Sequence, residues 1–149
     1  MAYTSLLLFR FLSIILIAGI VKVKAKTVQK KWGNIMKTVA LYNLGCKVNS
    51  YEMEGMGQKL REKGYHIVPF EEKADIYVVN TCTVTNIADR KSRQILHRAR
   101  QLNPDAVVVA VGCYVQTGMA NIEKDDGIDL AIGNNHKKDI AELLERYLE

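Results

Sequence analysis

The sequence predicts an α/β protein in which a parallel β-sheet is covered by helices on both faces, as a three-layer α/β/α fold. Short runs rich in β-branched residues alternate with stretches of helical periodicity, which indicates βαβ units with right-handed crossovers. The run at 106–111, AVVVAV, is apolar throughout, as expected for a strand buried on both faces. Five strands within about 110 residues favour a flavodoxin-like doubly wound sheet with the strand order 2-1-3-4-5.

The expected strands are separated by turn residues and helical stretches. In chain order they are Thr38–Leu44, Tyr65–Phe70, Ile76–Asn80, Ala106–Val111 and Asp129–Ile132. We place the second strand at an edge of the sheet, because Pro69 has no N–H group to donate to a ladder. Asn43, Asn49 and Asn80 are of a residue type common in turns and caps, and capping alone would explain them.

The expected helices lie between these strands. The first begins near Asn49, which forms a capping-box pattern with Glu52, and it ends at Gly64. Its apolar stripe, interpreted as core, consists of Met53, Met56 and Leu60. A second helix is expected over Thr85–Leu102, with the apolar face Ile87, Ala88, Ile95, Ala99 and Leu102. The remaining expected helices are a short one around Gln116–Glu123 and an amphipathic one over His136–Leu148.

Positive charge is concentrated in the first 35 residues. They hold six basic and no acidic side chains, whereas the rest of the chain holds 15 basic and 16 acidic ones. The net charge of +5 therefore does not indicate nucleic-acid binding by the globular part. We divide the chain into an N-terminal extension, residues 1–35, and one domain, residues 36–149.

The extension contains an apolar run at residues 5–21, interrupted by Ser5, Arg10 and Ser13. A membrane span needs about 20 apolar residues, and the run also lacks the pattern of a signal peptide. Two explanations remain open. The run is either a weak membrane anchor with the following lysines on the cytoplasmic side, or unselected sequence upstream of a true start at Met36. We favour the second explanation, because a clean strand begins directly after Met36.

The three cysteines of the chain, Cys46, Cys82 and Cys113, follow the first, third and fourth expected strands. These strands are neighbours in the order 2-1-3-4-5, and ligands of such sheets bind at the carboxyl edge. We therefore expect the three thiols to meet at that edge, although they are 36 and 31 residues apart along the chain.

Three thiolates suit two kinds of metal site. A [4Fe–4S] cluster takes thiolate ligands, and with three of them from the protein one iron stays open. Zinc is the alternative, because catalytic zinc takes three protein ligands and a water. None of the histidines, His66, His97 and His136, is near the cysteine loops. Three unrelated buried thiols are the remaining alternative, since free cysteine behaves as a small hydrophobe.

Three motifs surround these cysteines. They read NLGCKVNSYE at 43–52, NTCTVTNIADRKSR at 80–93 and VGCYVQ at 111–116. In sequence, order and spacing they resemble the N-terminal domain of the radical-SAM methylthiotransferases, over about residues 36–149. The form GCKVNS of the first motif is most similar to the branch that acts on threonylcarbamoyladenosine in tRNA.

The resemblance implies that Cys46, Cys82 and Cys113 hold an auxiliary [4Fe–4S] cluster whose open iron carries the sulfur to be inserted. The implied product is a methylthio group at C2 of N6-threonylcarbamoyladenosine beside the anticodon. A second [4Fe–4S] cluster and S-adenosylmethionine would belong to a radical-SAM domain, which is followed in the family by an RNA-binding domain. The C-x-x-x-C-x-x-C loop of the radical domain does not occur in this sequence, so we expect both domains to be absent. Whether this portion has activity by itself stays open.

A cytoplasmic location is expected, because a labile cluster needs a reducing compartment. Two functions of other classes remain open beside the cluster: a flavodoxin-like module that binds a small ligand without catalysis, and a zinc-stabilised interaction domain. Asn49 and Ser50 are expected to shape the cluster pocket.

The expected helix over Thr85–Leu102 carries a basic stripe. Arg90, Arg93, His97 and Arg100 recur at spacings of three and four, which puts them on one face. Because the stripe begins beside the expected cluster, Arg90, Arg93 and Arg100 are candidates for contact with tRNA phosphates or with the radical domain. An ordinary solvated face is the alternative.

Overall fold

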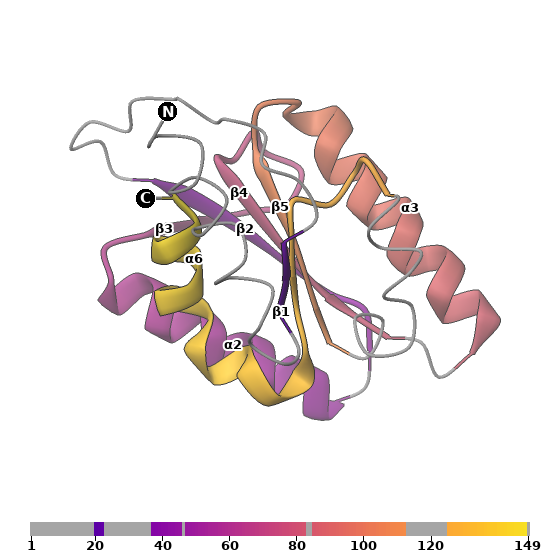
Figure 1. Ribbon diagram of the computed structural model, residues 1–149, viewed down its shortest axis with the longest axis horizontal. Coiled ribbons are helices and arrows are strands. Elements are labelled where there is room, and N and C mark those ends of the chain that lie inside the picture. Colours follow the sequence, from indigo (N-terminus) through magenta and orange to yellow (C-terminus); the bar gives the residue numbers. More distant parts are fainter. Residues whose placement is uncertain (1–19, 23–36, 46, 83–84, 113–124, 149) are drawn as a thin grey trace, which may run out of the picture.

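The computed structural model describes residues 20–22, 37–45, 47–82, 85–112 and 125–148. A central sheet lies between two layers of helices (Figure 1). Its parallel strands are β2 (Thr38–Asn43), β3 (His66–Val68), β4 (Ile76–Thr81), β5 (Val107–Gly112) and β6 (Leu130–Ile132). They are arranged as β3-β2-β4-β5-β6, which confirms the predicted order 2-1-3-4-5 and the edge position of the second strand.

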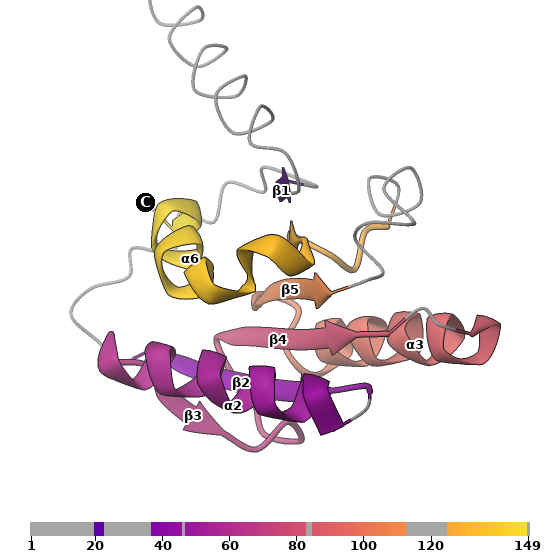
Figure 2. The same ribbon diagram turned by 90° about the horizontal axis from the view of Figure 1, so that it is seen from below.

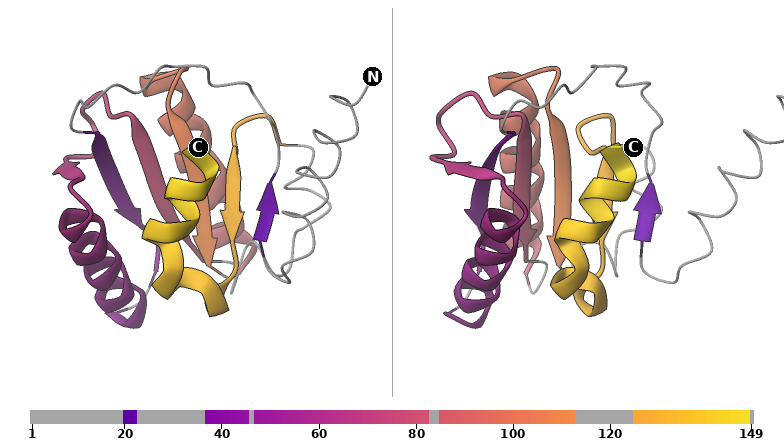
Figure 3. Two further views of the ribbon diagram at one scale, coloured as in Figure 1. Left: turned by 60° about the vertical axis from the view of Figure 1, so that its left-hand side comes forward. Right: turned by 90° about the vertical axis from the view of Figure 1, so that its left-hand side faces the viewer.

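A further strand, β1 (Ile20–Lys22), pairs antiparallel with β6 at the other edge of the sheet (Figure 3). These residues belong to the extension, for which no strand was predicted. Three residues at the end of an apolar run carry no alternation that would distinguish them from the rest of the run. The other residues of the extension lie outside the described part of the chain.

Helices cover the two faces of the sheet unequally (Figure 2). On one face lie α2 (Lys47–Glu62) and α6 (Ile140–Leu148), which contact each other. On the other face lies α3 (Asn86–Leu102). A 3₁₀ turn, η1 (Asn134–Asp139), precedes α6, so the helix expected over His136–Leu148 is divided in two. The helix expected around Gln116–Glu123 falls outside the described residues, and no described helix is long and apolar enough to cross a membrane.

Alternation along the central strands divides the core into two halves. Val78 and Val109 face α2 and α6, whereas Val79 and Val108 face α3. Every residue of β4 and β5 is buried, as predicted for strands covered on both sides. Helix α2 contributes Met53, Met56 and Leu60 to the first half, as predicted, and burial of each such side chain stabilises the fold by about 1.5–3 kcal/mol.

Helix α2 begins two residues before the position predicted from the sequence. It starts at Lys47, so Asn49 lies inside the first turn and is not the cap. Glu52 does not complete a capping box either, since its carboxylate pairs with Lys137 at 2.6 Å. The predicted end is confirmed. Gly64 has a φ of +88°, and the N–H of Tyr65 reaches back to the carbonyl of Leu60 at 3.0 Å, as in a Schellman motif.

Helix α3 begins as expected, because the hydroxyl of Thr85 accepts the N–H of Ala88 at 3.1 Å as an N-cap. Its predicted apolar face is confirmed in part. Ala99 is buried and Ile95 and Leu102 pack against the core, whereas Ile87 is exposed, and Ser92 and Leu96 are buried in addition. The first turn of α3 therefore has no described strand beneath it.

Candidate metal centre

The register of the sheet brings the starts of the three cysteine loops together. Asn43, three residues before Cys46, pairs in register with Asn80 on the neighbouring strand. Thr81, directly before Cys82, pairs in register with Gly112, which directly precedes Cys113. Adjacent strands lie about 4.8 Å apart, so the three loops leave one edge of the sheet side by side. Of the three cysteines, Cys82 is described, with a free and half-buried thiol, whereas Cys46 and Cys113 lie outside the described residues.

A hydrogen-bonded network joins the first two loops. The Nδ2 of Asn80 donates to the Oδ1 of Asn43 at 3.4 Å and to the carbonyl of Asn49 at 3.2 Å. Asn43 in turn donates to the hydroxyl of Ser50 at 2.8 Å, and the N–H of Leu44 donates to the carbonyl of Asn80 at 2.9 Å. The end of β2 and the first turn of α2 are thereby attached to β4.

Two glycines stand beside the cysteines that are not described, and a side chain added at either would displace a neighbour, which is backbone at Gly112 and the movable side chain of Asn49 at Gly45. A Cβ added to Gly112, whose φ is +113°, would lie 2.7 Å from the carbonyl oxygen of Thr81 and 3.0 Å from the Oδ1 of Asn80. A Cβ added to Gly45 would lie 2.2 Å from the Nδ2 of Asn49. Backbone can approach a bulky ligand closely at such glycines.

The backbone of Cys82 is attached to α3 through Ser92, which is fully buried. The N–H of Cys82 donates to the Ser92 hydroxyl at 3.4 Å, and that hydroxyl lies 3.2 Å from the Cys82 carbonyl and 2.9 Å from the carbonyl of Ala88. On the other side of the strand end, the hydroxyl of Thr81 donates to the carbonyl of Val111 at 2.9 Å. The middle cysteine thus leaves a strand that is fixed on both sides.

The surroundings fit a thiolate-bound cluster, although the ligand set itself stays a prediction. Within the described ranges, no three histidine, cysteine or carboxylate side chains lie together in a way that could hold a metal ion. The fit rests on Gly112, where backbone can approach a ligand closely, and on the neighbouring strand ends that precede the three cysteines.

Two residues of this edge were not expected from the sequence. Asn80 was interpreted as a turn or cap residue and Ser92 was given no role, but both are fully buried. A signal for each exists in the sequence. Asn80 interrupts the apolar run IYVV of β4, and Ser92 lies four residues before Leu96 on the buried face of α3.

Exposed basic residues lie along α3, with Arg90, Lys91 and Arg93 in its N-terminal half and Arg98 beyond them. Arg90 and Arg93 are exposed, and Arg93 pairs with Asp89 on the same helix at 3.2 Å. The imidazole of His97 lies 3.2 Å from the carboxylate of Asp125. Arg90 and Arg93 therefore remain on the surface near the candidate site.

Arg100 differs from these two arginines, because the fold itself engages its guanidinium. It pairs with Asp129 and donates to the carbonyls of Pro104 and Ala106 at 3.0 and 2.7 Å. The side chain of Arg100 is 17% exposed and that of Asp129 is 5% exposed. This placement argues against Arg100 as a contact for RNA or for another domain.

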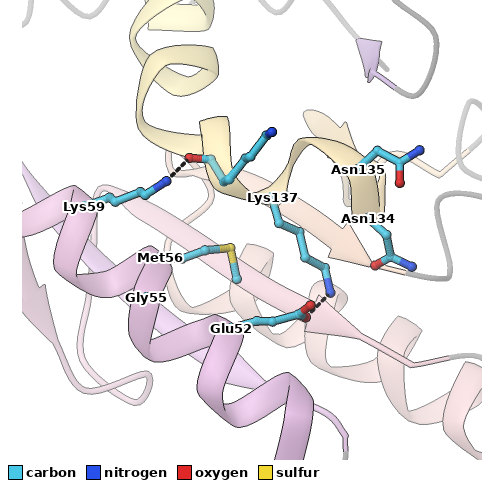
Figure 4. A pocket seen from close by; sticks show the side chains of 8 residues that line it. Glu52, Gly55, Met56, Lys59, Asn134, Asn135 and Lys137 are labelled. Atoms are coloured by element: carbon cyan, nitrogen blue, oxygen red, sulfur yellow. Dashed lines mark hydrogen bonds and ion pairs between the residues drawn. The ribbon is translucent and has the colours of Figure 1, made fainter.

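A pocket of about 330 Å³ lies between α2 and η1 (Figure 4). None of its described lining residues belongs to a cysteine loop. Its walls are formed by Glu52, Gly55, Met56, Lys59, Asn134, Asn135, Lys137 and Lys138. Inside it, the Nζ of Lys137 pairs with Glu52 at 2.6 Å, and the Nζ of Lys59 donates to the carbonyl of Lys138 at 2.6 Å. Both ammonium groups hold η1 against α2, so we assign these contacts to packing.

Comparison with known proteins gives relatives along most of the chain. Residues 38–133 match the family described as "Uncharacterized protein family UPF0004". A threonylcarbamoyladenosine tRNA methylthiotransferase MtaB from Bacillus subtilis (strain 168) is 46% identical over 114 residues, which are 76% of this chain and 25% of that protein. An MtaB from Aquifex aeolicus (strain VF5) is 46% identical over 111 residues, 74% of this chain and 27% of that protein.

A more distant relative is the ribosomal protein uS12 methylthiotransferase RimO from Thermoanaerobacter sp. (strain X514). It is 34% identical over 114 residues, 74% of this chain and 26% of that protein. The chain thus spans about a quarter of the length of the curated relatives it matches.

Solved structures with a similar fold include response regulators. A CheY-like receiver domain protein from Methanospirillum hungatei JF-1 has a TM-score of 0.59 and 15% identity, and the match covers 76% of this chain and 94% of that one. A response regulator from Thermotoga maritima has a TM-score of 0.56, also with 15% identity, over 76% and 98% of the two chains. At this identity the likeness concerns the doubly wound fold alone.

Proposed function

This chain belongs to the UPF0004 family, and from that membership we propose that it is the auxiliary-cluster domain of a tRNA methylthiotransferase. The observation that carries the proposal is the register of the sheet, in which the strand ends before Cys46, Cys82 and Cys113 are neighbours. The relatives support it, because MtaB and RimO proteins are both named as methylthiotransferases.

In this proposal the thiolates of Cys46, Cys82 and Cys113 hold one [4Fe–4S] cluster. When bound, the cluster would supply an iron with no protein ligand, at which sulfur for transfer could be held. The protein's own part is to hold three thiolates at fixed spacing. Asn80 and Ser92 contribute to this spacing through their bonds to the loops.

The proposed substrate is N6-threonylcarbamoyladenosine beside the anticodon of a tRNA, which would receive a methylthio group at C2. Two relatives named for this nucleoside share 46% identity with the chain, and they support this choice over the substrate of RimO. Radical chemistry, a second [4Fe–4S] cluster and S-adenosylmethionine are assigned to a radical-SAM domain outside these residues. A cytoplasmic location is part of the same proposal, since a labile cluster needs a reducing compartment.

Anaerobic reconstitution of the chain with iron and sulfide tests the cluster. We expect about four irons and four sulfides per chain, with broad visible absorbance, because a thiolate-bound cubane has that composition. Each of the variants Cys46→Ala, Cys82→Ala and Cys113→Ala should lose most of the iron. A variant that keeps full iron and an unchanged spectrum removes its cysteine from the ligand set.

The same preparation separates the two alternatives. Stoichiometric zinc without iron and sulfide would support the zinc-binding domain, and neither metal would support a module for a small ligand. Loading the protein with zinc in a parallel sample shows whether three thiolates accept both metals.

A further inference from the structure

The carboxamide of Asn80 lies where the three cysteine loops begin. The side chain is completely buried on the α2 face of the sheet, in the same row as Ile76 and Val78. Its backbone carbonyl accepts the N–H of Leu44, two residues before Cys46. Asn80 itself is two residues before Cys82.

Both N–H groups of this carboxamide are used on the side of the first loop. They donate to the Oδ1 of Asn43 and to the carbonyl of Asn49, at 3.4 and 3.2 Å. The side chain of Asn49 packs on Gly45, where an added Cβ would lie 2.2 Å from its Nδ2. A chain of contacts therefore runs from Asn80 to the residue directly before Cys46.

The other end of the carboxamide is directed at the third loop. A Cβ on Gly112 would approach the Oδ1 of Asn80 to 3.0 Å, so this oxygen and the residue before Cys113 are in close contact. The Oδ1 has no hydrogen-bond partner among the described residues.

An apolar side chain would satisfy the fold at this position more simply. Asn80 continues the apolar run of β4, whose residues are all buried, and a valine or leucine there would need no hydrogen bonds. The carboxamide instead joins the first loop to the residue before the third one, through its two Nδ2 donations and its contact with Gly112, which a valine or leucine could not do.

We propose that Asn80 is the positioning residue of the cluster site, which sets the spacing of the three cysteine loops through its carboxamide. This inference rests on the proposed function. The Nδ2 holds the first loop against β4, and the Oδ1 limits how closely the end of β5 approaches.

The test compares Asn80→Asp with Asn103→Asp in the anaerobically reconstituted 149-residue chain. Asn103 is a matched control, because it is also a buried asparagine in which Nδ2 donates to a carbonyl, that of Ala74 at 2.7 Å, but at the opposite edge of the sheet. Each change keeps the shape of the side chain and removes the Nδ2 donations.

We expect Asn80→Asp to release iron to a chelator about 10- to 100-fold faster than the wild type, as for other losses of a group that orients metal ligands. The midpoint potential and the EPR spectrum of the reduced cluster should also change. Asn103→Asp should leave the release rate, the potential and the spectrum unchanged. The new carboxylate at position 80 shifts the potential by its charge alone, so the potential is compared in the uncharged variant Asn43→Ala, where a merely structural role would leave the potential and the spectrum unchanged.

Asn43→Ala provides a second route if Asn80→Asp does not fold. It removes one of the two acceptors of Asn80 from a partly exposed position, so iron release should accelerate in the same direction by a smaller factor. Wild-type rates, potential and spectrum in both variants, or equal changes in Asn103→Asp, would overturn the role of Asn80 alone. A wild-type chain that holds no iron and sulfide would instead overturn the proposed function.

Discussion

The amino ends and the carboxyl ends of the parallel strands, here called the amino edge and the carboxyl edge of the sheet, both carry polar side chains in the interior. The roles of these side chains differ. At the amino edge, Asp75 accepts the N–H and the hydroxyl of Thr38 at 3.1 and 3.0 Å, and Asp129 accepts the N–H of Val108 at 2.9 Å. These carboxylates occupy donors that the starts of the strands leave open. At the carboxyl edge, the Oδ1 of Asn80 stays without a partner among the described residues.

The difference indicates that the two edges of the sheet have different roles. At the amino edge, the carboxylates of Asp75 and Asp129 are bonded to donors of neighbouring residues. The carboxyl edge keeps glycines and an unused acceptor beside the cysteine loops, as expected of the edge where this fold binds ligands. Changes at the amino edge should therefore affect stability, and changes at the carboxyl edge should affect metal binding as well.

The largest effect is expected at the amino edge, from Asp129→Ala. It leaves the buried guanidinium of Arg100 without its counter-charge, so the free energy of unfolding of the apoprotein should fall by about 3–5 kcal/mol in urea denaturation. As a control, Lys63→Ala breaks the exposed pair with Glu145 and should cost less than about 1 kcal/mol. A loss below 1 kcal/mol for Asp129→Ala would contradict a structural role of the pair.

Gly112→Ala should have the next largest effect and should act on both properties. Its positive φ and the close approach to Thr81 predict a loss of about 2–4 kcal/mol, together with less bound iron per folded chain. The matched change Gly64→Ala, also at positive φ but in open space, should cost about 1 kcal/mol and leave the iron content unchanged. Equal iron contents in the two variants would show that the conformation at Gly112, directly before Cys113, does not affect metal binding.

Ser92→Ala should cost about 1 kcal/mol and accelerate the release of iron, because the backbone of Cys82 loses its link to α3. Thr85→Ala on the same helix should cost a similar amount, about 1 kcal/mol, by removing the N-cap, without a change in release rate. Urea denaturation and chelator kinetics on the two variants make the comparison. Equal iron-release rates in Ser92→Ala and Thr85→Ala would contradict a role of Ser92 in holding Cys82.

A smaller effect on stability, but a distinct effect on RNA, is expected from the double change Arg90→Ala with Arg93→Ala. In a complete enzyme that contains this domain, the slope of log affinity for tRNA against log salt should decrease by about 1 for each lost phosphate contact. The free energy of unfolding should change by no more than about 0.5 kcal/mol, because both side chains are exposed. Unchanged affinity and salt slope would leave these arginines as ordinary surface.

The smallest effect is expected from removal of the extension. A chain that begins at Met36 lacks β1, whose three residues add only a short antiparallel edge to β6. It should fold and bind iron like the full chain, as judged by circular dichroism and iron analysis. Loss of folding or of iron would mean that the extension is a working part of the protein.

The sequence alone determined the doubly wound fold and its strand order. Continuous apolar runs such as that of β5, separated by helical stripes such as Met53, Met56 and Leu60, have few other ways to bury their surfaces. The order of strands then predicted which strand ends are neighbours, because topology depends on pattern and connection length more than on individual contacts. The position of Gly64 at the end of α2 was also readable, since a φ of +88° strongly favours glycine.

Only the tertiary structure decided which polar side chains are surface and which are interior. Arg90 and Arg100 belong to the same helical stripe, yet Arg100 is held by Asp129, which is 29 residues away along the chain. The apolar run before Asn80 indicates that it is buried, but only the folded chain shows that its carboxamide bonds to Asn43 and Asn49. Such roles depend on partners that are distant in sequence, and local pattern carries no information about which distant groups will be near enough to bond.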